Sequence, residues 1–183
     1  MDNQHKDDYQ VVISEVELRD RIASLAQQIS KDYEGRGVHC VGVLDNCFLF
    51  VADLVRAITC DVHCQFVKPY THVFRDRDTE TTQISYSPEI DVRGEHILLC
   101  EGILSTGQTT DFLIRNFQAR GAASIAVCCL LDRPSDRRVN LDVAYSGFRV
   151  GAQRLAGFGL GFGTPLQRSN VPFIFAAPVA HAQ

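Results

Sequence analysis

Apolar residues recur along the chain at two different spacings, and the alternation of these spacings predicts the fold. Between positions 15 and 33 they follow each other every three or four positions, which predicts an amphipathic helix. These residues are Leu18, Ile22, Leu25 and Ile29. Ser14 and Glu17 have the spacing of a capping box at its start. The segments 48–58 and 109–118 predict two more helices.

Continuous apolar runs lie between these helical segments and are typical of buried strands. We expect strands at 39–44, 61–68, 96–100, 124–130, 143–148 and 173–176. Strands that alternate with helices indicate an α/β fold, with a mainly parallel twisted sheet flanked by helices on both faces. Ligands of such sheets bind beyond the carboxyl ends of the strands, so motifs that follow a strand are candidates for the site.

The polar stretches predict less order. Residues 1–10 are expected to form a disordered tail, which leaves 11–183 as a single domain. The segment 70–87 is charged and rich in threonine, and it predicts a long mobile loop with a strand near its end. His72 in this loop could reach the site when the loop closes.

Charge and composition narrow the range of partners and the compartment. The chain has 183 residues and a formal net charge of −4, without a run of lysine or arginine, which argues against nucleic acid or an anionic membrane as a partner. No stretch is long enough to span a bilayer, and the polar start predicts no signal peptide. An odd number of cysteines, seven, predicts reduced core thiols and a cytoplasmic protein.

One motif carries candidate chemistry. A buried strand from His96 runs through a short loop into a helix, and four residues form the turn at the helix start: Thr106, Gly107, Gln108 and Thr109. Amide N–H groups and the helix dipole at such a turn bind anions, and glycine lets an anion approach the backbone closely. A plain helix cap is the alternative, because threonine and serine favour that position for structural reasons.

The motif resembles the loop of type I phosphoribosyltransferases that binds phosphoribosyl pyrophosphate (PRPP). Further stretches resemble the hypoxanthine branch of that family at 41–44 with 48–58, 130–134, 137–140, 145–148, 157–160 and 171–174. The resemblance extends over residues 11–175 and implies the fold of that family, with a small hood built from the chain ends. It also implies a small-molecule ligand, such as a nucleotide or another phosphorylated or carboxylated compound, and a homodimer or homotetramer.

The departures from the family pattern concentrate on acidic residues. Glu101 is kept, but Gly102 replaces the second acid of the pair, and Ser105 replaces an aspartate that assists proton transfer in the family. The stretch 150–152 lacks a further aspartate that helps to coordinate magnesium. Too few carboxylates are left for the usual magnesium site, so we predict no metal and no cofactor, with magnesium only if residual PRPP chemistry survives.

The first loop of the family normally exposes backbone to pyrophosphate. Here it contains Asp45 and Asn46, and the added carboxylate is expected to repel pyrophosphate. We therefore predict a rebuilt site with Glu101, Ser105 and Asp45 as catalytic residues.

The resemblance also implies a pocket for the substrate or its base, made by Arg133, Tyr145, Ser146 and Asn46. Core packing is the alternative role for Tyr145, and a solvated turn is the alternative for Arg133.

Three functions are compatible with the sequence. The first is an enzyme that has lost PRPP-dependent transfer and been repurposed, for example for group transfer or condensation in a specialised biosynthetic pathway. The second is a non-catalytic homologue that binds nucleotides and regulates. The third is a weak but genuine hypoxanthine or guanine phosphoribosyltransferase. We favour the first narrowly, because the substitutions are polar.

Overall fold

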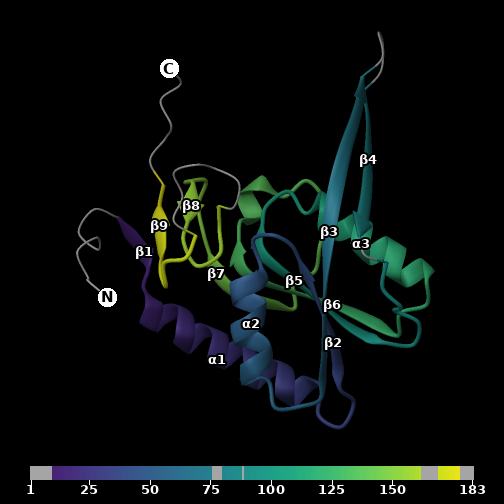
Figure 1. Cartoon of the computed structure of the whole chain (residues 1–183), viewed down its shortest axis with the longest axis horizontal. Coiled ribbons are helices and arrows are strands. Elements are labelled where there is room, and N and C mark those ends of the chain that lie inside the picture. Colours follow the sequence, from purple (N-terminus) through teal and green to yellow (C-terminus); the bar gives the residue numbers. More distant parts are fainter. Residues whose placement is uncertain (1–9, 76–79, 88, 162–168, 178–183) are drawn as a thin grey trace.

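A computed structural model describes residues 10–75, 80–87, 89–161 and 169–177 (Figure 1). The main sheet has six strands in the order β4-β3-β2-β5-β6-β7. Their bounds are β2 Val38–Val43, β3 Val62–Arg75, β4 Glu80–Ser87, β5 His96–Leu104, β6 Ser124–Asp132 and β7 Tyr145–Arg149. All neighbours pair in parallel except β3 with β4. The predicted α/β fold with a mainly parallel sheet is confirmed.

Helices cover both faces of this sheet (Figure 1). α1, Glu15–Asp32, and α2, Phe48–Ala57, pack with alternate residues of the strands, among them Cys40, Leu98 and Leu130. α3, Gln108–Ala119, packs on the other face. Burial of apolar side chains on both faces explains why the inner strands have continuous apolar sequences. The predicted capping box is present, since Ser14 Oγ accepts from the Glu17 amide and the Glu17 carboxylate accepts from the Ser14 amide.

A second sheet joins the two ends of the chain. Its antiparallel strands are β1 Val11–Ile13, β9 Ile174–Ala176 and β8 Leu155–Ala156, in the order β1-β9-β8. This sheet corresponds to the expected hood. The sequence predicted β9 but not the two other strands, which are only three and two residues long.

The prediction of a loop at 70–87 is wrong for most of that segment. β3 continues to Arg75 and pairs with β4 in a long antiparallel hairpin, in a register that runs from Lys68 opposite Ser87 to Arg75 opposite Glu80. Threonine, valine and aromatic residues favour strands, whereas the polar composition had suggested a loop. Tyr86 anchors the hairpin through edge contacts with Phe112 and Phe117 of α3. The His72 side chain and the tail 1–9 lie outside the described residues.

The cysteines behave as core thiols. The described part of the chain includes all seven; none forms a disulfide, and five are buried: Cys40, Cys47, Cys100, Cys128 and Cys129. No helix in the described ranges is both long and apolar enough to cross a membrane.

Candidate active site

A cavity of about 230 Å³ opens beyond the carboxyl ends of β2 and β5, where the fold predicts a ligand site. The described residues that line it are Val43, Leu44, Pro69, Glu101, Ile103, Leu104, Ser105, Thr106, Gly107, Thr109 and Thr110. The structure thus brings together Glu101, Ser105 and most of the predicted turn. β5 extends four residues beyond its predicted end, so Glu101 lies in the strand itself and not in the loop after it.

The start of α3 is formed by four residues, which we call the cradle: Thr106, Gly107, Gln108 and Thr109. Gly107 is the N-cap residue and has a left-handed φ of 78°, and no side chain of the described residues caps the helix there. The contact from the Gln108 amide to Thr106 Oγ1 is long, at 3.5 Å. The N-cap is therefore a glycine rather than the threonine or serine of a plain cap, and Thr106 makes only this long contact with the first turn. The amides of the first turn and the helix dipole together favour an anion at this point.

Gly107 is required on steric grounds as well. A Cβ atom at this position would lie 2.6 Å from Leu141 Cδ1 and 3.2 Å from Arg137 Cδ. The segment 137–141 therefore packs directly against the cradle, and the Arg138 amide donates to the Thr106 carbonyl oxygen at 3.0 Å. The packing of the segment 137–141 against the cradle fixes the position of the cradle backbone.

Glu101 is held by two residues that sequence reasoning missed. Thr110 Oγ1 donates to Glu101 Oε1 at 2.8 Å, and Thr110 is buried in the first turn of α3. Burial raises the pKa of Glu101 to about 7, while the Thr110 hydrogen bond and the nearby Arg137 charge oppose this rise. The carboxyl is therefore protonated in a large part of the molecules at neutral pH, which weakens its repulsion of an anion in the cradle.

Arg137 comes from the segment that covers the cradle. One guanidinium nitrogen, Nη2, donates to Asp132 Oδ1 at the end of β6. The other, Nη1, is buried and has no partner among the described residues. No signal in the sequence distinguished this arginine from its exposed neighbour Arg138.

Ser105 finds a carboxylate partner from a distant part of the chain. Its Oγ donates to Asp136 Oδ2 at 3.0 Å, and Asp136 belongs to the short 3-10 helix η1, Pro134–Asp136. The sequence did not reveal this partner, because it is 31 positions away from Ser105.

Asp45 is not brought into this constellation. Its carboxylate is half exposed and accepts from Lys68 Nζ at 2.7 and 3.0 Å, and Asp45 is not among the described residues that line the cavity. The expected repulsion of pyrophosphate is therefore largely removed, because Lys68 supplies a positive charge beside the carboxylate.

The first loop, residues 44–47 between β2 and α2, closes over the position of the missing acid. A Cβ atom at Gly102 would lie 2.2 Å from the Asn46 carbonyl oxygen and 3.1 Å from the Cys47 amide nitrogen. Asn46 Oδ1 accepts from the Gly161 amide at 3.3 Å, so this side chain binds backbone of the chain itself. The loop leaves no space for a carboxylate at position 102.

The predicted pocket for a base is not assembled as expected. Tyr145 is buried at the amino-terminal end of β7, away from the cavity, and its hydroxyl donates to Asp32 Oδ2 at the end of α1. A buried hydroxyl needs a partner, and core packing rather than stacking on a ligand explains this residue. The backbone carbonyl of Ser146 accepts from Arg21.

Arg133 is tied down by two contacts. Its Nη2 donates to the Gln153 carbonyl oxygen at 2.7 Å, and its Nη1 lies 3.7 Å from Asp136 Oδ2. Its Nε is buried without a partner among the described residues. The arginine is partly buried rather than a solvated turn residue, but it does not line the cavity in the described residues.

The donor set does not suit a magnesium ion held by protein. The described residues contain no group of three or more His, Cys, Asp or Glu side chains that could bind a metal. Glu101 is the single carboxylate among the described residues that line the cavity, and one of its oxygens already accepts from Thr110. Magnesium prefers several hard oxygen ligands, so the described side chains of this cavity do not by themselves make a magnesium site.

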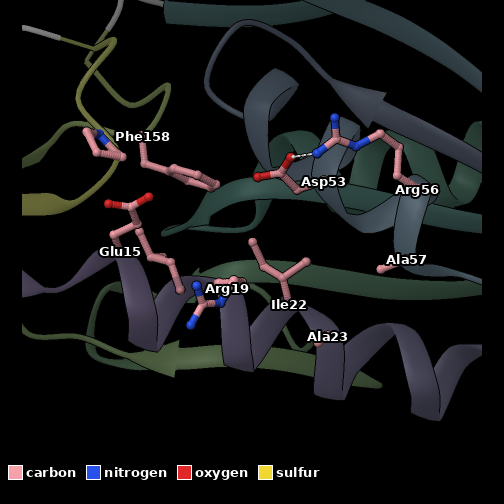
Figure 2. A pocket seen from close by; sticks show the side chains of 10 residues that line it. Glu15, Arg19, Ile22, Ala23, Asp53, Arg56, Ala57 and Phe158 are labelled. Atoms are coloured by element: carbon pink, nitrogen blue, oxygen red, sulfur yellow. Dashed lines mark hydrogen bonds and ion pairs between the residues drawn. The ribbon is translucent and has the colours of Figure 1, made fainter. Parts of the chain in front are cut away.

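A second cavity, of about 340 Å³, lies between α1, α2 and the hood (Figure 2). Glu15 and Arg19 project from α1, whereas Asp53 and Arg56 project from α2 and form an ion pair at 2.8 Å (Figure 2). The side chains that line this second cavity carry charges of both signs, and the cavity lies away from the carboxyl ends of the strands. We therefore do not assign the active site to it.

The geometry defines an α/β protein with a cavity and the cradle at the carboxyl edge of a mainly parallel sheet, and comparison with known proteins gives it a family. The family model "Phosphoribosyl transferase domain" matches residues 14–163. The hypoxanthine phosphoribosyltransferase of Haemophilus influenzae is 32% identical over 155 residues, which are 83% of this chain and 87% of that protein. The hypoxanthine-guanine enzyme of Streptococcus pneumoniae is 30% identical over 164 residues, 90% of each chain.

Solved structures agree with this assignment. A hypoxanthine phosphoribosyltransferase from Staphylococcus aureus has a TM-score of 0.85 and 25% identity, covering 97% of this chain and 96% of that one. A hypoxanthine-guanine phosphoribosyltransferase from Bacillus anthracis has a TM-score of 0.78 and 29% identity, covering 91% and 96%. The chain belongs to the type I phosphoribosyltransferase family, in its hypoxanthine-guanine branch.

Proposed function

We propose that the protein transfers the phosphoribosyl group of PRPP to a 6-oxopurine such as hypoxanthine or guanine. The observation that carries this proposal is the cradle, whose helix start is shaped by Gly107 and opens into the cavity beside Glu101. The relatives named above are hypoxanthine or hypoxanthine-guanine phosphoribosyltransferases. They support the third function considered from the sequence better than a repurposed enzyme.

Each part of the cavity has a task in this reaction. The amides of the cradle hold the phosphate of the phosphoribosyl group, because a helix start attracts an anion without requiring a cation. Glu101 lines the same cavity as the cradle and would meet a ribose hydroxyl there, since a carboxyl that is partly protonated can both donate to and accept from a hydroxyl. Ser105 directly follows β5 and lines the cavity, where it would face the reacting purine. A purine nitrogen then forms a bond to C1′ as pyrophosphate leaves.

The test is formation of nucleotide. Purified protein is incubated with PRPP, magnesium and either hypoxanthine or guanine, and nucleoside monophosphate is measured by chromatography. The proposal predicts product that depends on enzyme and on PRPP. Absence of product with both bases, and with manganese in place of magnesium, would contradict it.

A second candidate function is a nucleotide-binding homologue without turnover. The close contact of Gly102 with Asn46 favours it, because that contact removes the space for a carboxylate beside Glu101. This candidate predicts that nucleoside monophosphate raises the melting temperature of the protein while no product forms in a long incubation. Any turnover above that of a heat-inactivated control would rule it out.

The predicted homodimer or homotetramer and the cytoplasmic location stay predictions. Light scattering coupled to size-exclusion chromatography measures the oligomer directly, because the mass of one chain is 20.4 kDa. A mass of one chain over the working concentration range would contradict the oligomer.

A further inference from the structure

Two loops at the carboxyl edge of the sheet are joined by backbone hydrogen bonds on either side of Ser105. The Arg133 amide donates to the Leu104 carbonyl oxygen at 3.0 Å, and the Arg138 amide donates to the Thr106 carbonyl oxygen at 3.0 Å. Because these bonds fix the register of the two loops, Asp136 lies beside Ser105.

This register brings the side chains of Ser105, Ser135 and Arg133 into contact with the Asp136 carboxylate. Ser105 Oγ donates to Asp136 Oδ2 at 3.0 Å, and Ser135 Oγ donates to the other carboxylate oxygen, Oδ1, at 3.2 Å. The Arg133 Nη1 atom lies 3.7 Å from Oδ2 and places a positive charge beside it. Ser105 lines the cavity, whereas Asp136 is not among the described residues that do so. Asp136 therefore acts on the cavity through Ser105.

The reaction needs an acceptor for one proton. When one nitrogen of a neutral purine forms a bond to C1′, the purine must lose the hydrogen carried by another nitrogen. A serine hydroxyl alone is a poor acceptor near neutral pH, but a serine that donates its hydrogen to a carboxylate turns an oxygen lone pair toward the cavity. The pair thus has the polarity that such a transfer requires.

We propose that Asp136 is the positioning residue and final proton acceptor of the transfer step, and that it acts through the Ser105 hydroxyl. The purine N–H proton passes to Ser105 Oγ while the Ser105 proton passes to Asp136 Oδ2. The bond from the purine nitrogen to C1′ forms, and the bond from C1′ to pyrophosphate oxygen breaks with its electron pair. Asp136 then releases its proton to solvent, to which its side chain is 34% exposed. This inference rests on the proposed function.

The experiment compares five variants: D136N, S105A, S105D and the double variants S105A/D136N and S105D/D136N. D136N and S105A are each expected to lower kcat about 100-fold, the lower range for loss of a general base, with little change in KM for PRPP. Combining the two changes is expected to cost no more than either alone, because residues that act as one unit are not additive. S105D puts a carboxylate at the cavity directly, so the double variant should recover activity to within about tenfold of the wild type.

Ser135→Ala is the matched control, since it removes a contact to the same carboxylate from the other oxygen. Its kcat should stay within about threefold of the wild type. The nucleotide affinity and the melting temperature of each variant show whether its fold is intact. S105A removes the Ser105 hydroxyl but leaves Asp136 and its contact with Arg133 unchanged. It therefore tests the role of the Ser105–Asp136 hydrogen bond separately from that of the carboxylate.

The inference is overturned if D136N keeps kcat within about threefold of the wild type, or if S105D does not improve D136N. A role limited to holding Arg133 would give the second result, because a new carboxylate at position 105 does not restore that contact. Failure of the proposed function looks different. In that case the wild type itself forms no nucleotide, and the inference falls with it.

Discussion

The cradle and the first loop border the same cavity, yet they have diverged from the family pattern to very different extents. The cradle keeps its threonines and a glycine whose left-handed φ and close contact with Leu141 disfavour any other side chain. The first loop contains Asp45 and Asn46, and its backbone lies against Gly102, the position at which the family pattern has an acid. Binding through backbone amides depends on chain geometry, which is difficult to replace. A carboxylate is a side chain, which a neighbouring loop can supply or displace.

The largest effect is expected from restoring the missing acid. In G102D the new side chain would collide with the Asn46 carbonyl oxygen, 2.2 Å from the Cβ position, and with the Cys47 amide. We expect the free energy of unfolding to fall by about 3 kcal/mol, as measured by urea denaturation. G151D is the control, because a Cβ there meets only the flexible Gln153 side chain at 3.4 Å. If G102D were as stable as G151D, the first loop would not occupy this space.

The cradle side is tested with G107A. The left-handed φ of 78° should cost about 1–2 kcal/mol of stability, and the contact with Leu141 should distort the amides. Affinity for nucleoside monophosphate, measured by calorimetry, should therefore fall about tenfold or more. G121A is matched in conformation, with φ of 88°, but its Cβ has no atom closer than 3.7 Å. G121A should lose stability but keep its affinity for nucleoside monophosphate. If G107A and G121A lost the same affinity, the loss would reflect backbone strain alone and not the position of the amides in the cradle.

An effect of pH is expected from Glu101. Its pKa in the folded chain is raised from 4.5 to about 7, so between these values the folded state binds more protons than the unfolded state. Stability should therefore fall as pH rises through this range, by up to about 3 kcal/mol, and fall no further above it. E101Q should remove this fall, as followed by urea denaturation from about pH 5 to pH 8. An unchanged pH dependence in E101Q would show that Glu101 is not the group that titrates.

The smallest effect is expected from the ion pair between the first loop and β3. Asp45 and Lys68 form an ion pair at 2.7 Å, but both side chains are close to half exposed. A double-mutant cycle with D45A and K68A should give a coupling energy below about 1 kcal/mol. K68A alone should weaken PRPP binding slightly, because it leaves the Asp45 charge without a partner, and the double variant should recover it. A coupling energy of several kcal/mol would mean that the pair organises the first loop.

Local patterns predicted the fold because each depends on residues close in sequence. The helix predicted at 15–33 is Glu15–Asp32 in the structure, since apolar periodicity and the Ser14 cap determine it. The β3–β4 hairpin was missed because its polar residues lack the apolar face by which buried strands are identified. Its pairing, rather than its composition, makes it a hairpin.

The site was predicted in part for the same reason. Glu101 in β5 and Ser105 to Thr109 directly after it were found because strand, loop and helix are contiguous. Asp136 was not found because its contact with Ser105 depends on how two strands lie side by side. Tyr145 was assigned to the ligand, but its hydroxyl binds Asp32, which is 113 positions away. Contacts of this range follow from the sheet topology and are not visible in a local motif.

Calorimetry with two matched ligands tests whether the cradle binds the phosphate of a ribose phosphate. Inosine and inosine monophosphate differ only in that phosphate. The account predicts that the wild type binds the monophosphate about 100-fold more tightly than the nucleoside, and that G107A loses most of this difference. Equal affinities of the wild type for the two ligands would contradict it.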